Sequence, residues 1–286
     1  MLVIGASGLL GSKIMELGMQ KYEVYGTYSK NNKDGLTRLD VKDRKQVFDL
    51  LGGIKPDLVV DSHGLNNVDY AESHREELWA TNVEGSKNVA EASQNVGAKY
   101  IFISSDYVFS GKKRLYTEKD RPDPVNYLGK GKWALESILE ILDIDYIVAR
   151  TSGLYGKGSS TGKKSFVQFI VENLQKGIKT EVISDQYSSP TLVDDVANSL
   201  FALSELNQNG IFHIVGKDCL TKYDFAKHIC KEFGLDSSLI SPCSTASLSQ
   251  AARRPDRVRM STSKLRKITL KIPAGVKEGL RMINKQ

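Results

Sequence analysis

Three glycines near the N-terminus are the first residues of the sequence that could hold a ligand. They form a G-x-x-G-x-x-G turn over residues 5–11, directly after an apolar run at residues 1–4 that predicts a buried strand. A helix over residues 12–20 and a second strand over residues 23–28 are predicted next. In this context backbone N–H groups can approach a pyrophosphate at the positive end of the helix. The pattern indicates a dinucleotide site, with a helix-capping loop as the plain alternative.

Further candidate cofactor contacts follow the next predicted strands. The second strand ends at Tyr28-Ser29-Lys30, where NAD-preferring sites usually carry an acid. Because no acid stands there, Ser29 and Lys30 could hold a 2′-phosphate, which favours NADPH over NADH; an exposed loop lysine is the alternative. The contacts predicted from the residues alone are Gly5, Ser7, Gly8, Leu9, Leu10, Gly11, Tyr28, Ser29, Lys30, Asp40, Val41, Ser62, His63 and Gly64.

His63 is the one residue in this group that could move a proton. It follows a predicted strand at residues 57–61, at the end of the sheet where such folds bind ligands. Nothing nearby in the sequence is expected to orient its ring. We therefore expect His63 to pack beside the cofactor, with a role as catalytic base as the alternative.

The elements that must position these residues alternate between strand and helix through about residue 150. This order predicts right-handed βαβ units and an α/β fold with a doubly wound, Rossmann-type parallel sheet. We expect residues 1–150 to form the NAD(P)-binding part, with residues 192–216 returning to it. Residues 151–191 and 217–286 are expected to form a smaller C-terminal α/β part that binds substrate.

Three further helices and one loop are predicted. Helices are predicted over residues 68–79, 82–96 and 126–142. Residues 154–164 are rich in Gly, Ser and Lys, which predicts a loop.

Composition limits the class of function. The chain has 286 residues, of which 40% are hydrophobic and 26% charged, as expected of a protein with a buried core. Its net charge is +6. No apolar run approaches about 18 residues, so no membrane segment is expected. The basic residues form no long block, which favours a phosphate-bearing ligand over nucleic acid. Cys219, Cys230 and Cys243 lack metal-like spacing, so we predict that they are not metal ligands. Three cysteines are also a poor disulfide framework, so we predict a reducing, cytoplasmic location.

Motifs along nearly the whole chain resemble the extended short-chain dehydrogenase/reductases, and within them the dTDP-4-dehydrorhamnose reductase family. In chain order they are GASGLLG at residues 5–11, Val68-Asp69 with Glu72, Asn82-Val83-Glu84-Gly85, SSDYVFSG at residues 104–111, Arg150-Thr151-Ser152 with Tyr155-Gly156, Asp185-Gln186 with Pro190-Thr191, and Arg254-Pro255 with Ser263-Lys264-Leu265. No single motif is decisive, but their order and spacing together are specific.

The resemblance implies a mechanism. In this family a Tyr protonates the substrate carbonyl as hydride arrives from the nicotinamide, and a Lys four residues later lowers the Tyr pKa and holds the nicotinamide ribose. A Ser or Thr hydrogen-bonds the carbonyl. Ser105 matches the Ser/Thr position and Lys132 the Lys position. By the same resemblance, the cofactor contacts gain Asn82 and Lys132, and the predicted substrate contacts are Asp106, Tyr107, Ser152 and Arg254.

The third catalytic position departs from the family pattern. Aligning Gly129 and Lys132 places Leu128, which has no proton to give, where the Tyr should be. Tyr127 is adjacent, and we include it among the catalytic candidates, but it lies about 140° from Lys132 around a helix. It would reach the site only from an unwound first helical turn, which Gly129 and Gly131 would loosen.

Two classes of function stay open from the sequence. The first is an NADPH- or NADH-dependent reductase of a nucleotide-linked 4-keto-6-deoxy sugar, impaired by Leu128. The second is a silent NAD(P)-binding regulatory subunit resembling the methionine adenosyltransferase beta subunit. A damaged active site is a third, plainer alternative. The sequence leaves the exact sugar, any metal requirement and the oligomeric state open, with a homodimer as one alternative.

Overall fold

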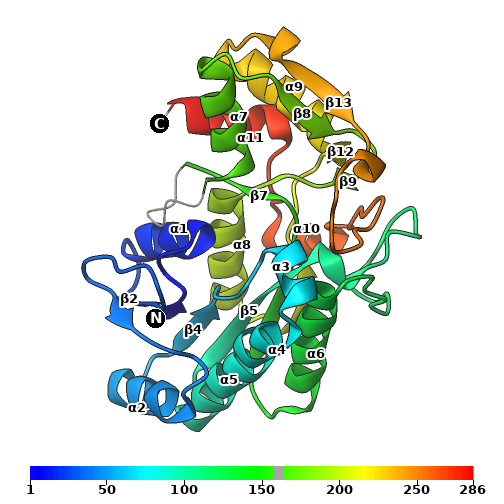
Figure 1. The fold of residues 1–286 in the computed structure, drawn as a ribbon. Helices are drawn as coiled ribbons and strands as arrows, with labels where there is room; N and C mark the ends of the chain where they lie inside the picture. The colour runs from blue at the N-terminus through cyan, green and yellow to red at the C-terminus, as the bar shows by residue number, and fades with distance from the viewer. Residues whose placement is uncertain (158–163, 286) are drawn as a thin grey trace.

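A seven-stranded parallel sheet lies at the centre of the molecule, with helices on both faces (Figure 1). The structure is a computed structural model that describes residues 1–157 and 164–285. The strand order is β11-β6-β5-β4-β1-β2-β3, and every neighbouring pair is parallel. The predicted doubly wound α/β fold is confirmed.

The strands of the sheet are short and their bounds lie close to the predicted ones. They are β1 (Leu2–Ile4), β2 (Tyr25–Tyr28), β3 (Thr37–Arg38), β4 (Leu58–Asp61), β5 (Lys99–Ser105), β6 (Tyr146–Thr151) and β11 (Gly210–His213). One face is covered by α1 (Leu9–Gly18), α8 (Val193–Glu205) and α10 (Ser263–Thr269), and the other by α2 (Arg44–Ile54), α5 (Ser86–Asn95) and α6 (Tyr127–Ile141).

Alternation along the strands supplies both core layers. In β5, Ile101 packs on the α1 and α8 side, whereas Tyr100 and Phe102 pack on the α2, α5 and α6 side. All three side chains are buried. A sheet that is covered on both faces needs apolar residues at every position, which explains why these strands read as unbroken apolar runs.

A second group of elements lies above the carboxyl ends of the strands (Figure 1). It contains α7 (Phe166–Gln175), β8 (Thr180–Ile183), α9 (Lys222–Phe233), β13 (Ile240–Cys243) and α11 (Val276–Lys285), around an apolar core of their own. β8 pairs in parallel with β13. Two shorter ladders join β7 (Leu154–Tyr155) to β10 (Thr191–Leu192), and β9 (Tyr187–Ser188) to β12 (Leu220–Thr221).

Two predicted elements are wrong in detail. The helix expected over residues 68–79 is broken at His74, whose φ of −125° and ψ of 56° are not helical, so it forms α3 (Val68–Ser73) and α4 (Arg75–Leu78). A π-helix, Trp79–Gly85, then leads directly into α5. The loop expected at residues 154–164 begins instead with a strand, β7, and its residues 158–163 lie outside the described part of the chain.

No helix within the described residues is long and apolar enough to cross a membrane.

A buried ion pair joins α6 to β6 beneath the crevice. The Arg150 guanidinium donates to both Glu136 carboxylate oxygens, with Nη2 to Oε2 at 2.6 Å and Nε to Oε1 at 3.0 Å. Ser104 Oγ also donates to Glu136 Oε1, at 2.5 Å. The two charged side chains are 1% and 2% exposed, so each depends on the other to offset its lost hydration.

We expect Glu136→Gln to lower the free energy of unfolding by about 3–5 kcal/mol, because it leaves Arg150 charged and unpaired in the core. Urea unfolding followed by circular dichroism measures the change. The double change Glu136→Leu with Arg150→Met should recover most of the loss. Glu140→Gln, on the exposed side of the same helix, is the matched control. Native-like stability of Glu136→Gln would contradict this account.

Candidate active site

The candidate site lies at the carboxyl end of the sheet, where the strand order reverses. β1 is flanked by β4 on one side and β2 on the other, so the segments that leave β1 and β4 diverge and open a crevice. Residues 5–11 follow β1, residues 62–64 follow β4, and Ser105 is the last residue of β5. The fold therefore brings together segments that are far apart in the sequence.

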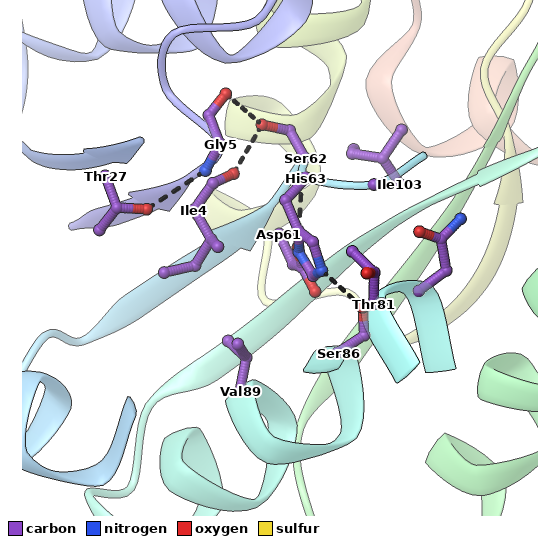
Figure 2. Close-up of polar contacts among 12 residues, drawn as sticks. Ile4, Gly5, Thr27, Asp61, Ser62, His63, Thr81, Ser86, Val89 and Ile103 are labelled. Carbon is purple, nitrogen blue, oxygen red and sulfur yellow. Dashed lines mark hydrogen bonds and ion pairs between the residues drawn. The ribbon is translucent and has the colours of Figure 1, made fainter. Parts of the chain in front are cut away.

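The glycine turn is closed tightly against its neighbours (Figure 2). Gly5 has a φ of +78°, and its N–H donates to Thr27 Oγ1 at 3.3 Å. A Cβ atom at Gly11 would lie 2.3 Å from the Gly5 carbonyl oxygen and 2.8 Å from Ser62 Oγ, so no larger residue fits. Ser62 Oγ donates to the Ile4 carbonyl at 2.8 Å, which ties the end of β4 to the end of β1.

Helix α1 begins at Leu9, three residues before the predicted start. Gly8 is in extended conformation, and its carbonyl accepts the Ser12 N–H at 2.9 Å. The first N–H groups of the helix consequently face the crevice directly after the turn. Ser7 and Leu9 lie at this helix start, whereas the Leu10 side chain is buried in the core below it.

His63 is oriented by a carboxylate, contrary to our expectation. Its Nδ1 bonds Asp61 Oδ1, and its Nε2 lies 3.0 Å from the Thr81 carbonyl oxygen (Figure 2). Tyr100 donates to the other Asp61 oxygen at 2.5 Å. Alternate residues of a strand point the same way, so the spacing of Asp61 and His63 at the end of β4 was an available signal.

Both ring nitrogens of His63 face acceptors, which requires the doubly protonated imidazolium. Burial opposes the charged form of His63, but the Asp61 carboxylate outweighs burial and raises the pKa of the imidazole. Burial likewise opposes the charge on Asp61, yet His63 holds the pKa of that carboxyl below its usual value. A buried cation therefore lies beside the crevice.

Lys132 is a second buried cation near this point. Its Nζ donates to the Ile103 carbonyl at 2.8 Å and lies 4.7 Å from the Phe102 ring centroid. Burial lowers the pKa of Lys132 to about 8, against the opposing attraction of Asp61 and Glu136. The Lys132 amine is therefore held at Ile103, which lies two residues before Ser105 on β5.

Ser105 and three predicted substrate contacts form one hydrogen-bonded group. Ser105 Oγ donates to Asp106 Oδ1 at 3.0 Å and accepts the Tyr107 N–H at 3.2 Å. Ser152 Oγ donates to Asp106 Oδ2 at 2.5 Å. Burial raises the pKa of the Asp106 carboxyl, and the two serine hydroxyls oppose the rise.

Helix α6 buries Leu128 and leaves Tyr127 partly buried beside it. The helix begins at Tyr127, and Asn126 Oδ1 caps it by accepting the Gly129 N–H at 2.9 Å. Leu128 is 3% exposed and belongs to an apolar cluster with Val68, Ala71, Leu78 and Ala252, against which Tyr127 also packs. The Tyr127 ring lies 6.4 Å from the Trp79 ring and 5.1 Å from the Arg75 guanidinium carbon. The first turn is not unwound.

The glycines of this helix mark close packing, so our expectation that they loosen the turn is wrong. A Cβ at Gly129 would lie 2.1 Å from the Tyr107 carbonyl oxygen, and one at Gly131 would lie 3.0 Å from Leu78 Cδ2. Helix α6 can approach the segment after β5 because Gly129 lacks a side chain, and it can approach α4 because Gly131 does.

Arg254 reaches the site but is engaged within the protein. Its two terminal nitrogens donate to the two Asp69 oxygens at 2.7 and 2.6 Å, and Nη1 also donates to the Ala252 carbonyl. The guanidinium lowers the pKa of Asp69 to about 2. Burial raises the pKa of Tyr107 to about 12 despite the nearby Arg254.

An acid approaches the second strand from a place the sequence did not indicate. Lys30 Nζ lies 3.9 Å from Glu77 Oε1, and the Lys30 side chain is 81% exposed. Glu77 belongs to α4, 47 residues further along the chain. Tyr28 is the last residue of β2, and Ser29 is exposed directly after it.

The remaining predicted contacts divide between surface and scaffold. Asp40 is exposed, whereas Val41 is buried and its carbonyl accepts from Asn88 Nδ2 at 3.0 Å. Asn82 is buried and makes paired hydrogen bonds to the Leu65 backbone at 2.8 and 3.0 Å. A Cβ at Gly64 would lie 3.2 Å from Asn82 Oδ1, so Asn82 fixes the segment after β4.

Lys222 is a charged residue near Asp106 that the sequence analysis does not single out. It is the first residue of α9, with an exposed surface although protein atoms crowd its amine. Crowding and the Arg254 charge lower the pKa of Lys222, while Asp106 and Asp69 raise it. No local pattern distinguishes it from an ordinary helix lysine. Among the described residues, no group of three His, Cys, Asp or Glu side chains could hold a metal ion.

A parallel sheet with a glycine turn at its switch point, and a buried lysine on the helix after β5, defines a Rossmann-like protein of the short-chain dehydrogenase/reductase type. Residues 1–286 match the RmlD substrate binding domain family, and the chain belongs to that family. The family resemblance predicted from the motifs is confirmed.

Three similar proteins illustrate the membership. The chain is 31% identical to a dTDP-4-dehydrorhamnose reductase of Bacillus anthracis, whose crystal structure is in complex with NADP; the TM-score is 0.91, with 99% of this chain and 98% of that chain covered. It is 32% identical to the spore coat polysaccharide biosynthesis protein SpsK of Bacillus subtilis, over 84% of this chain and 81% of the relative. It is 31% identical to methionine adenosyltransferase 2 subunit beta of Mus musculus, over 98% and 86%.

We expect the His63 imidazole to titrate above its ordinary pKa of 6.5, because the carboxylate of Asp61 raises it. Nitrogen-15 NMR of the ring follows the titration. The stability that the protonated ring contributes is present at low pH and is lost as pH rises through the raised pKa. Asp61→Asn should bring the pKa below 6.5, since burial and the Lys132 charge then outweigh the remaining hydrogen bond to the Thr81 carbonyl. Asp57→Asn, exposed before the same strand, is the control, and a native value at or below 6.5 would refute the assignment.

Proposed function

We propose that this chain is an NAD(P)H-dependent reductase of a nucleotide-linked 4-keto-6-deoxy sugar. The observation that carries the proposal is the buried Lys132, whose amine is held by the Ile103 carbonyl, two residues before Ser105 at the carboxyl end of β5. A lysine with a lowered pKa at a ligand crevice is costly to bury and suggests a functional role. The similarity to a dTDP-4-dehydrorhamnose reductase that is solved with NADP supports the same class of reaction.

The residues of the crevice fit a nicotinamide dinucleotide. At Gly11 a single Cβ atom would collide with the Gly5 carbonyl and Ser62, so the glycine lets α1 start directly against the turn, where its first N–H groups could meet a pyrophosphate. We assign the pyrophosphate to residues 5–11 and the nicotinamide ribose to Lys132. When bound, the nicotinamide would supply the hydride.

We assign the cofactor and the sugar nucleotide to different parts of the chain. Residues 1–150 with 192–216 would hold the cofactor, which is supported by β11 pairing with β6 in the main sheet. Residues 151–191 and 217–286 would hold the sugar nucleotide.

The predicted substrate contacts suit a sugar nucleotide. Asp106 and Ser152 offer polar groups for sugar hydroxyls, and Tyr107 an aromatic wall. Arg254 can bind a diphosphate with paired hydrogen bonds, although it must exchange its Asp69 contact to do so. The Lys222 amine adds a second cation at this end of the cleft.

We place the reaction in the cytoplasm, because the three cysteines are free thiols that suit a reducing compartment. A homodimer stays a prediction.

A silent regulatory subunit is the second candidate, and Leu128 is the observation that favours it. The acid position of the family pattern carries an apolar, buried side chain, and the chain is similar to a methionine adenosyltransferase beta subunit. Turnover of a 4-keto sugar nucleotide by the unmodified chain distinguishes the two candidates.

We expect the chain to bind NADPH about tenfold or more tightly than NADH, since a charge-assisted hydrogen bond from Lys30 to a 2′-phosphate has that value. Lys30→Ala should erase the preference. Glu77→Gln should increase it, because Glu77 otherwise competes for the Lys30 amine. Titration calorimetry with both cofactors measures the ratio. Equal affinities for the unmodified chain would show that Lys30 does not hold a phosphate.

We expect Leu128→Tyr to raise turnover of a dTDP-4-keto-6-deoxy sugar with NADPH by at least about tenfold, because a positioned general acid typically contributes about a hundred- to ten-thousand-fold. NADPH affinity should change little. The measurement is steady-state oxidation of NADPH.

Tyr127→Phe is the matched control, since the Tyr127 ring lies against Trp79 and the residue is about 140° from Lys132 around α6. It should leave turnover unchanged. Full activity of the unmodified chain that Tyr127→Phe abolishes would instead make Tyr127 the acid, with the register shifted by one residue.

A further inference from the structure

The surroundings of Asp106 are unusual for a buried acid. The residue is 8% exposed, and no Lys, Arg or His of the described chain forms an ion pair with it. Its two carboxyl oxygens instead meet two hydroxyls, Ser105 Oγ at 3.0 Å and Ser152 Oγ at 2.5 Å. Hydroxyls can donate or accept, so both protonation states of Asp106 find partners here.

The protonation state of Asp106 decides where the Ser105 hydroxyl proton can point. A hydroxyl has one proton and two lone pairs. One lone pair of Ser105 accepts the Tyr107 N–H at 3.2 Å. While Asp106 is ionised, the single Ser105 proton is committed to Asp106 Oδ1. When Asp106 is protonated, its own O–H can donate to the second lone pair, and the Ser105 proton becomes free to point elsewhere.

Ser152 stabilises this arrangement from the other side. Its Oγ accepts the Ser189 N–H at 3.2 Å and donates to Asp106 Oδ2 at 2.5 Å. A proton on Asp106 Oδ1, the oxygen that faces Ser105, leaves this second bond in place.

We propose that Asp106, acting through the Ser105 hydroxyl, is the proton source for carbonyl reduction in this chain, in place of the tyrosine that Leu128 replaces. The inference rests on the proposed function, because Ser105 must touch the substrate carbonyl.

The step balances in atoms and charge. The carbonyl carbon receives the hydride and the carbonyl oxygen takes the proton of Ser105 Oγ, which gives the alcohol. Ser105 Oγ takes the proton of Asp106 Oδ1 at the same time. Asp106 is left as a carboxylate and regains a proton from solvent before the next cycle.

Three titratable or charged side chains face Asp106 from the neighbouring elements. They are Tyr107 beside it, Cys219 before β12, and Lys222 at the start of α9. The Lys222 ammonium favours the ionised carboxyl, whereas burial favours the acid and prevails, so the pKa of Asp106 lies above its usual value. Turnover should consequently be higher at low pH and fall as pH rises through this raised pKa.

Steady-state turnover across pH, in two backgrounds, tests the relay. In the unmodified chain Asp106→Asn should reduce turnover about a hundredfold or more and remove the dependence on the Asp106 titration. In a Leu128→Tyr background the same change should cost less than about tenfold, because the tyrosine then supplies the proton. Asp49→Asn, exposed on α2, is the control for loss of a carboxylate.

The outcomes separate the relay from the proposed function. Turnover by the unmodified chain that survives Asp106→Asn overturns the relay and leaves the reductase intact. Equal losses in the two backgrounds also overturn it, because they indicate a purely structural role. An inactive unmodified chain with an active Leu128→Tyr variant overturns the relay alone. Inactivity of both chains overturns the proposed function, and the relay with it.

A second readout needs no substrate or cofactor. Infrared spectra of the free protein should contain a carboxylic-acid carbonyl band that disappears as pH rises above the ordinary range of aspartate. Because burial also raises the pKa of Asp195, the band is measured as the difference between the unmodified chain and Asp106→Asn, and no such difference should separate the unmodified chain from Asp49→Asn. A spectrum that is the same for the unmodified chain and Asp106→Asn at every pH would refute a protonated Asp106.

Discussion

The close approach of α6 to the end of β5 is the constraint on which the rest of the site depends. It is made at Gly129, where any side chain would collide with the Tyr107 carbonyl. This contact fixes the rotation of the helix, and the rotation decides which residues face the crevice. Lys132 then reaches the Ile103 carbonyl, whereas Tyr127 is turned toward Trp79. Because the Gly129 contact holds the backbone of α6 in place, the helix cannot easily rotate to bring Tyr127 to the position that Leu128 occupies.

Around this helix the protein buries several charges, each with a different compensation. Arg150 and Glu136 neutralise each other directly, and His63 is paired with Asp61. Within the described residues, the Lys132 amine donates to a carbonyl and lies over the Phe102 ring, and the Asp106 carboxyl is bonded by hydroxyl and backbone groups. The first two pairs hold the scaffold, since breaking either would leave an isolated charge in the core. The latter two groups can change their protonation with less cost, which is the property that proton transfer requires.

Much of the fold was predictable from the sequence because its signals are local. The glycine turn, the apolar strands and the alternation with helices each depend on a few neighbouring residues, and the sheet follows from their order. The break at His74 and the π-helix after it were not predictable, because tertiary packing decides them. The partners of the site residues were also hidden: Asp69 meets Arg254, and Glu77 meets Lys30, across long stretches of chain. Only Asp61 and His63 carried a local signal for their pairing, through the two-residue period of a strand.

The central claim is that carbonyl reduction at this site proceeds without a tyrosine. A crystal structure of the chain with NADP⁺ and a 4-keto-6-deoxy sugar nucleotide tests this most directly. We predict that the carbonyl oxygen lies within hydrogen-bond distance of Ser105 Oγ, with Leu128 beside it and the Tyr127 ring still packed against Trp79. An unwound first turn of α6, with the Tyr127 hydroxyl on the carbonyl oxygen, would contradict the account.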